Sequence, residues 1–421
     1  MNTQSPEDYV RSLGQAARQA AGAVALSSGK QRNTALLAAA AGIRDAHAEL
    51  QAANEEDLAA ARQAGLAEAM IDRLCLTDAR IESMAVALEQ VAAWPDPVGG
   101  TIAEWDRPNG LHIVKRRVPI GVIGIIYESR PNVTADAAGL CLKAGNACIL
   151  RGGKEARQSN LAIAAVLRRA LASAGLPAGA ITVIESTDRA VVPAMARAEG
   201  LIDVIIPRGG EALIRAVTEA ATIPVIKHYA GNCHVYVHAA ADLDMAEAIC
   251  MNAKCQRPGV CNAMETLLVD AAVAEQFLPR IAAKLLAAGV ELRGCERSRQ
   301  IVGKMAPAED NDWTREYLAL ILAVRVVDSL DAAIVHINTY SSAHTEAIVT
   351  ADAAAAERFT AAVDSSSVMV NASTRFADGG EYGLGAEVGI STDKLHARGP
   401  MGVDDLTTYK WIVTGSGQVR Q

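Results

Sequence analysis

Short apolar runs alternate with longer segments of helical periodicity along most of the chain after Gly121. The first series reads GVIGIIYE, ACILRGG, ITVIES, IDVIIPRGG and IPVIKHY, with helical patterns such as NLAIAAVLRRALASAG between the runs. Short β-branched runs between helices are typical of parallel strands buried on both faces, so this series predicts a doubly wound α/β lobe. A second series, ETLLVD, LALILAVRVV, EAIVTA and SSVMVNA, predicts a second α/β lobe over residues 255–375.

The segments outside this alternation have other patterns. The first hundred residues are helical in pattern, with a start signal at Asn33-Thr34 and a stop at Gly65. In TIAEWDRPNGLHIVKRRVP, the dipeptide Asn109-Gly110 separates two strand-like segments, which indicates a hairpin. The C-terminal YKWIVTG predicts one more strand. Because an isolated hairpin is marginally stable, we expect hairpin and tail strand to form a small sheet that packs against a second subunit.

These patterns together predict three units. Residues 1–99 and 119–254 would form a first, ligand-binding α/β lobe, and residues 255–375 a second lobe. Residues 100–118 and 400–421 would form the small β element for oligomerisation, as a homodimer or a dimer of dimers. The length of 421 residues suits two large lobes better than one core.

Composition excludes several classes of protein. The net charge of −8 and the lack of a basic run argue against a nucleic-acid partner. No apolar stretch reaches the roughly 18 residues of a membrane span, and the N-terminus has no export signal pattern. The eight cysteines form no CxxC pair and no zinc spacing, and KHYAGNCH also fits no familiar zinc pattern. We therefore expect a cytoplasmic protein with free thiols and no metal site.

The segment NAKCQRPGVCNA holds two cysteines that differ in their expected surroundings. Cys255 would end a helix, where carbonyl dipoles disfavour a thiolate. Cys261 would emerge after the turn at Arg257-Pro258-Gly259, near free backbone N–H groups and two cations. Cys261 is therefore the better candidate for a nucleophile, and the alternative is that both are packed thiols.

Two Gly-Gly pairs follow predicted strands, in ILRGGKE and IIPRGGEA. Ligands of open α/β sheets bind at the carboxyl ends of strands, although Gly-Gly there is often only a turn. The first pair, Gly152-Gly153, has Arg151 and Lys154 beside it, and the second, Gly209-Gly210, follows Arg208, which favours a phosphate-bearing ligand. In the glycine-rich tail, Arg375, Lys394 and Arg398 are either solvated charges or ligands for a carboxylate or phosphate.

Five blocks match one family in order along nearly the whole chain. They are PIGVIGIIYESRPNVTADAAGLCLKAGNACILRGGKEA, DVIIPRGG, PVIKHYAGNCHVYV, NAKCQRPGVCNAMETLLVD and GAEVGISTDKLHARGPMG. The chain thereby resembles the γ-glutamyl phosphate reductases, a divergent branch of the aldehyde dehydrogenase superfamily. The resemblance implies a Rossmann-like cofactor domain and a catalytic domain with Cys261 as the nucleophile.

The resemblance also implies roles for other residues. Lys154 stands where the superfamily holds the ribose 2′-hydroxyl of NAD with an acid, so Lys154 and Arg151 favour the 2′-phosphate of NADPH. Glu316 resembles the glutamate that orients the nicotinamide ribose, and Ser129 stands where relatives place an oxyanion-hole Asn. Arg257, Arg375, Lys394 and Arg398 are candidates for the substrate's phosphate and α-carboxylate. His228 stands near the position of the general-base Glu of hydrolytic relatives, which leaves phosphate as the natural partner of the acyl group.

The implied reaction is the NADPH-dependent reduction of γ-glutamyl phosphate to glutamate 5-semialdehyde through a cysteine thioester, the second step of proline biosynthesis. A transient contact with glutamate 5-kinase would hand over the labile acyl phosphate. One alternative is a hydrolytic NAD(P)-dependent aldehyde dehydrogenase, against which the missing Glu argues. The other is a non-catalytic nucleotide-binding protein, against which Cys261 and Glu316 argue.

Overall fold

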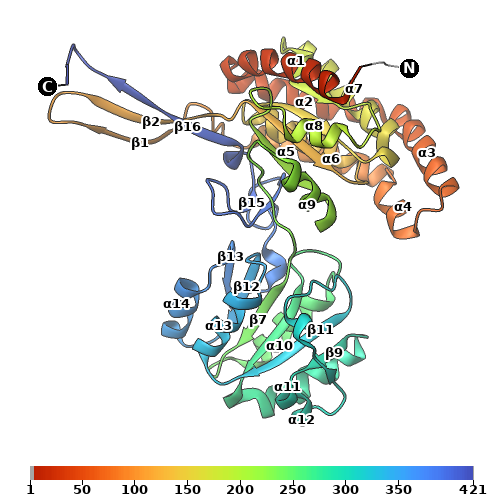
Figure 1. Ribbon diagram of the computed structural model, residues 1–421, viewed down its shortest axis with the longest axis vertical. Coiled ribbons are helices and arrows are strands. Elements are labelled where there is room, and N and C mark those ends of the chain that lie inside the picture. The colour runs from red at the N-terminus through yellow and green to blue at the C-terminus, as the bar shows by residue number, and fades with distance from the viewer. Residues whose placement is uncertain (1–3, 421) are drawn as a thin grey trace. The chain divides into compact units, whose positions relative to one another are not determined.

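The chain folds into two compact units. The computed structural model describes residues 4–420. Unit 1 runs to Lys227 and includes Gly383–Gly389 and the chain from Met401 onward, and unit 2 comprises His228–Tyr382 and Ile390–Pro400 (Figure 1). The boundary therefore lies at residues 227 and 228, not at 254 as predicted. The reason is the strand β7 (Cys233–Val237), which pairs with strands of the second series and so belongs to the second sheet.

The sheet of unit 1 is parallel, in the order β5-β4-β3-β6. Its strands are β3 (Val122–Tyr127), β4 (Ala147–Arg151), β5 (Ile181–Val183) and β6 (Val204–Arg208). All of β3 is buried, as expected for a strand covered on both faces. The fifth apolar run, IPVIKHY, forms only an isolated bridge between Val225 and Ile205. The strand order changes direction beside β3, so the loops after β3 and β6 flank the switch point of this sheet.

Helices account for most of the remainder of unit 1. They are α1 (Pro6–Leu26), α2 (Gly29–Asp45), α3 (His47–Gln63), α4 (Glu68–Leu74), α5 (Asp78–Ala93), α6 (Asn132–Lys143), α7 (Arg157–Ser173), α8 (Val191–Ala196) and α9 (Glu211–Ala220), with short 3₁₀ turns η1 (Lys154–Ala156), η2 (Ala178–Ala180) and η5 (Asp404–Leu406). The helix expected from Asn33 begins earlier, because Ser28 accepts a capping hydrogen bond from the Gln31 N–H at 3.2 Å. The predicted segment is also split at Ala46 into α2 and α3.

The sheet of unit 2 is likewise parallel, in the order β10-β9-β11-β8-β7-β12-β13. Its strands, besides β7, are β8 (Met264–Asp270), β9 (Glu291–Gly294), β10 (Ala306–Pro307), β11 (Ile321–Val327), β12 (Thr345–Val349) and β13 (Ser367–Val370). Its helices are α10 (Leu243–Cys255), α11 (Ala271–Ala287), α12 (Glu296–Ile301), α13 (Leu330–Tyr340) and α14 (Ala353–Ala362), with 3₁₀ turns η3 (Asp310–Trp313) and η4 (Thr374–Phe376). The glycine-rich tail contributes the paired strands β14 (Gly389–Ser391) and β15 (Gly399–Met401).

The predicted hairpin and tail strand form one antiparallel sheet. Strands β1 (Thr101–Asp106), β2 (His112–Pro119) and β16 (Thr407–Thr414) lie side by side in the order β1-β2-β16 (Figure 1). Gly110 adopts φ 85° at the turn, a conformation that favours glycine. The rings of Trp105 and Trp411 meet edge to face with centroids 5.6 Å apart, and both side chains remain exposed.

Among the described residues 4–420, no helix has the length and apolar character needed to cross a membrane.

Candidate active site

Cys261 lies in unit 2, in the loop between the end of α10 and the start of β8. Helix α10 ends at Cys255, as the sequence predicts, and the chain then turns through Arg257-Pro258-Gly259. Cys261 is partly exposed. Burial raises the pKa of Cys255 and raises that of fully buried Cys233 much further, so both neighbours are held as thiols. The thiol chemistry of this region is therefore left to Cys261.

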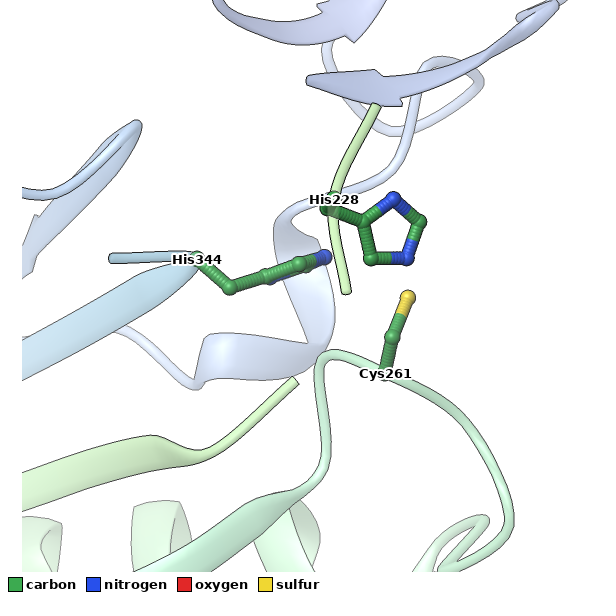
Figure 2. Close-up of side chains that lie close together, drawn as sticks. All are labelled: His228, Cys261 and His344. Atoms are coloured by element: carbon green, nitrogen blue, oxygen red, sulfur yellow. The ribbon is translucent and has the colours of Figure 1, made fainter. Parts of the chain in front are cut away.

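Two imidazoles lie around the sulfur of Cys261, those of His228 and His344 (Figure 2). One ligand atom from each of the three side chains lies within 4.8 Å of the others. The two rings meet edge to face, with centroids 5.3 Å apart. Nδ1 of His228 donates to the carbonyl of Ile390 at 2.9 Å, since a carbonyl oxygen can only accept. That bond fixes the tautomer of His228, so Nε2 is its basic nitrogen.

The backbone of Cys261 packs directly on Gly231. A Cβ built on Gly231 would lie 1.8 Å from the carbonyl oxygen of Cys261 and 2.5 Å from its Cα, so no other residue fits there. The N–H of Gly231 donates to Oε1 of Glu316 at 2.9 Å. Gly231 thus connects the predicted nucleophile to the predicted ribose-binding glutamate within one unit.

A buried ion pair closes the loop that carries Cys261. Nζ of Lys254, at the end of α10, lies 2.6 Å from Oε2 of Glu265 in β8, and both side chains are fully buried. Burial raises the pKa of Glu265 to about 7 and lowers that of Lys254, each against the effect of its partner. The other oxygen of Glu265 accepts from the N–H of Leu318 at 3.2 Å, two residues from Glu316. One carboxylate therefore fixes both the nucleophile loop and the Glu316 loop.

The four predicted substrate-binding cations lie in two separate groups in unit 2. Arg375 donates a hydrogen bond to Gln256 at 2.8 Å. Burial and the nearby charge of Arg257 lower the pKa of Arg375, whereas the charge of the Cys261 thiolate raises it. Arg375 and Arg257 therefore belong to the surroundings of Cys261. Lys394 and Arg398 instead pair with Asp364, whose pKa they lower.

The predicted phosphate loop after β4 lines a pocket of unit 1. Arg151, Gly152, Gly153 and Lys154 line it together with residues of the loop after β5. The Nε of Arg151 is buried and, within residues 4–420, has no hydrogen-bond partner. A Cβ at Gly152 would meet the Asn160 amide at 2.1 Å, so this wall is closely packed. A buried guanidinium edge in a pocket with further cations suits an anion.

Ser129, Gly209 and Gly210, the other predicted site residues of unit 1, lie beside the acidic residues Glu155 and Glu128. Ser129, after β3, donates its hydroxyl to Glu155, so that proton is not directed at an oxyanion and the predicted oxyanion role has no support from this contact. The bond also engages the acid next to Lys154. The N–H of Gly210 donates to Glu128 at 3.0 Å, so Gly209 and Gly210 lie at the switch point with a carboxylate already bound there.

Sequence reasoning missed His344, Gly231 and the Lys254–Glu265 pair as parts of this site. No local pattern around His344 indicates a site. It meets Cys261 because β12, which follows His344, and β8, which follows Cys261, both pair with β7. Gly231, in the loop before β7, could have been identified from the sequence, because a glycine in a loop permits another backbone to approach closely.

Comparison with known proteins agrees with the fold. Residues 3–317 match the family model described as the aldehyde dehydrogenase family. The chain therefore belongs to the aldehyde dehydrogenase family, and it is an oxidoreductase that uses a nicotinamide cofactor.

Individual relatives share one description. A gamma-glutamyl phosphate reductase of Moorella thermoacetica is 57% identical over 98% of this chain and 99% of its own. The crystal structure of the gamma-glutamyl phosphate reductase of Thermotoga maritima matches with a TM-score of 0.97 and 46% identity, over 98% of this chain and all of that one. The Saccharomyces cerevisiae enzyme of that description matches with a TM-score of 0.55 and 31% identity, over 99% of both chains.

Proposed function

We propose that this chain reduces γ-glutamyl phosphate to glutamate 5-semialdehyde and phosphate with NADPH, as the second step of proline biosynthesis from glutamate. The observation that carries the proposal is the partly exposed Cys261 facing the imidazole of His228, which the carbonyl of Ile390 orients. A nucleophile, a base and a group that orients the base are the parts that covalent catalysis needs. The full-length relatives named above add the substrate.

Cys261 attacks the acyl carbon of the substrate. His228 accepts the thiol proton at Nε2 and remains beside the sulfur as an imidazolium. The new C–S bond forms as the C–O bond to phosphate breaks, and phosphate leaves with that electron pair. Arg375 and Arg257 offset the charge of the departing phosphate. As an imidazolium, His228 has no basic nitrogen left with which to activate water, so the thioester persists until it is reduced.

NADPH, when bound, supplies the hydride that reduces the thioester. The lining at Arg151 and Lys154 suits the charge of the 2′-phosphate of that cofactor, because it offers a buried donor edge and a second cation, while Ser129 engages the neighbouring Glu155. Glu316 would hold the nicotinamide ribose. Collapse of the tetrahedral intermediate then regenerates the thiolate of Cys261 and releases the aldehyde.

Lys394 and Arg398 would hold the α-carboxylate of the substrate, with Asp364 as the group that positions both cations. We further propose that the β1-β2-β16 sheet joins two copies of the chain as a homodimer, or two dimers. Its edge strands β1 and β16 are exposed along nearly their whole lengths and carry Trp105 and Trp411. The eight free cysteines fit a cytoplasmic location.

The reverse reaction provides the test. We expect oxidation of glutamate 5-semialdehyde with NADP to require phosphate or arsenate. The reductase activity of the Cys261→Ala variant should fall by several orders of magnitude, and the matched Cys255→Ala variant should keep nearly full activity. Robust oxidation without phosphate would instead indicate a hydrolytic enzyme, and an active Cys261→Ala variant would show that the nucleophile is another residue.

A further inference from the structure

His228, Cys261 and His344 form a cluster of ligands that suit a borderline-soft metal ion, here called the His-Cys-His cluster. One ligand atom from each lies within 4.8 Å of the other two (Figure 2). Tetrahedral zinc with bonds of about 2.0–2.3 Å holds its ligand atoms roughly 3.4–3.6 Å apart. A contraction on the order of 1 Å therefore completes the geometry, and the partly exposed Cys261 and His228 have room to move.

An oxygen atom engages Nδ1 of both imidazoles, and in His228 this contact also fixes the tautomer. Nδ1 of His228 donates to the Ile390 carbonyl at 2.9 Å, and Nδ1 of His344 lies 2.8 Å from Oγ1 of Thr345. Metal-ligating histidines typically have their second nitrogen engaged by an oxygen, which orients the ring and fixes the tautomer. In both rings the oxygen engages Nδ1, so Nε2 is the nitrogen that would bind the metal.

Charges of both signs surround the cluster. The guanidinium groups of Arg375 and Arg257 oppose a second cation. The carboxylates of Glu316 and Glu346 favour one, whereas that of Glu265 is already paired with Lys254. The carboxylates therefore compensate the arginines, so the charge around the cluster allows a dication that also gains a thiolate ligand.

We propose that the His-Cys-His cluster binds Zn²⁺ through Nε2 of His228, Nε2 of His344 and the sulfur of Cys261, with water in the fourth position. The thiol proton of Cys261 passes to the solvent. The three protein ligands replace all but one of the waters of the hydrated ion, and the displaced waters also pass to the solvent. The bound ion blocks the thiolate that would attack the substrate, so we expect zinc to inhibit the reductase reversibly. The expectation of no metal site rested on spacing along the chain, which cannot reveal ligands brought together from three separate segments.

The binding part of this inference is independent of the reaction, whereas the inhibition rests on the proposed function. The test therefore uses Co²⁺ as a spectroscopic substitute for Zn²⁺, added to the full-length protein in buffer without thiols. We expect one Co²⁺ per chain, with a thiolate-to-cobalt charge-transfer band and the visible bands of tetrahedral cobalt. The charge-transfer band should disappear in Cys261→Ser. Affinity should fall at least tenfold in His228→Gln and His344→Gln.

Matched controls keep the result interpretable if the buried His344 variant fails to fold. Cys255→Ser removes another partly exposed thiol, and His336→Gln removes a buried imidazole of the same unit, and both should bind Co²⁺ as the wild type does. Zn²⁺ should displace Co²⁺, and EDTA should restore reductase activity. A charge-transfer band that persists in Cys261→Ser, or an affinity within twofold of wild type in His228→Gln, would overturn the proposal. Normal cobalt binding by a protein without reductase activity would overturn the proposed function alone.

Discussion

Replacing Gly231 with alanine should misplace the nucleophile without removing any catalytic group. The added Cβ would lie 1.8 Å from the carbonyl oxygen, 2.4 Å from the carbonyl carbon and 2.5 Å from the Cα of Cys261. Non-bonded carbon contacts are comfortable only at roughly 3.5 Å, so the two backbones must separate by about 1–1.5 Å. All three clashing atoms are backbone atoms, so no side-chain rotation relieves the contact.

A displacement of about 1 Å at a reacting group reduces the rate about 10²-fold, which corresponds to about 2.7 kcal/mol of transition-state stabilisation. We expect kcat of Gly231→Ala to fall by at least that factor. The KM for NADPH should also rise, because the N–H of Gly231 donates to Glu316, the side chain that would hold the nicotinamide ribose. Overpacking should also lower the free energy of unfolding by about 1–3 kcal/mol.

The assay is steady-state reduction of γ-glutamyl phosphate, with iodoacetamide labelling of Cys261 as a direct measure of thiol placement. Gly303→Ala is the matched control, because it lies in the same unit and its added Cβ would meet no atom within 4 Å. It should behave as the wild type. A Gly231→Ala enzyme with kcat within threefold of wild type and normal labelling would refute the inference that the close packing at Gly231 positions Cys261.

Three further predictions concern the cofactor, the assembly and the acid stability. Lys154→Glu should lower kcat/KM for NADPH at least tenfold and leave kcat/KM for NADH nearly unchanged. The control Lys30→Glu, on the surface of the same unit, should change neither value. Equal use of both cofactors by the wild type would contradict this prediction. Deleting Tyr409–Gln421 should give smaller, less stable particles by light scattering, and a monomeric full-length protein at micromolar concentration would refute the assembly. Burial lowers the pKa of His336 to about 3, below its unfolded value of about 6.5, so stability is complete above pH 6.5 and declines as the pH falls towards 3. Urea unfolding at pH 5.5 should therefore show a loss of about 1.4 kcal/mol relative to pH 7.5 that His336→Gln lacks, and an equal loss in both proteins would contradict it.

The elements that local pattern controls were predictable. The four buried strands β3 to β6 coincide with apolar runs, and Asn109-Gly110 does form the turn of a hairpin that pairs with the tail strand. The end of α10 at Cys255 also follows from its sequence, because Arg257-Pro258-Gly259 cannot continue a helix. These features depend on side-chain size, backbone freedom and hydrogen-bonding capacity over a few residues, all of which the sequence states directly.

The sequence by itself determined that this chain has two parallel α/β sheets, a hairpin with a partner strand, and a cysteine after a helix end as the candidate nucleophile. Only the tertiary structure decided that β7 belongs to the second sheet, because pairing partners are set by packing between distant segments. It also decided that Gly231, His228 and His344 surround Cys261, and that Asp364 gathers Lys394 and Arg398. These contacts join residues far apart along the chain, and their free energy depends on burial and distance, which no local pattern encodes.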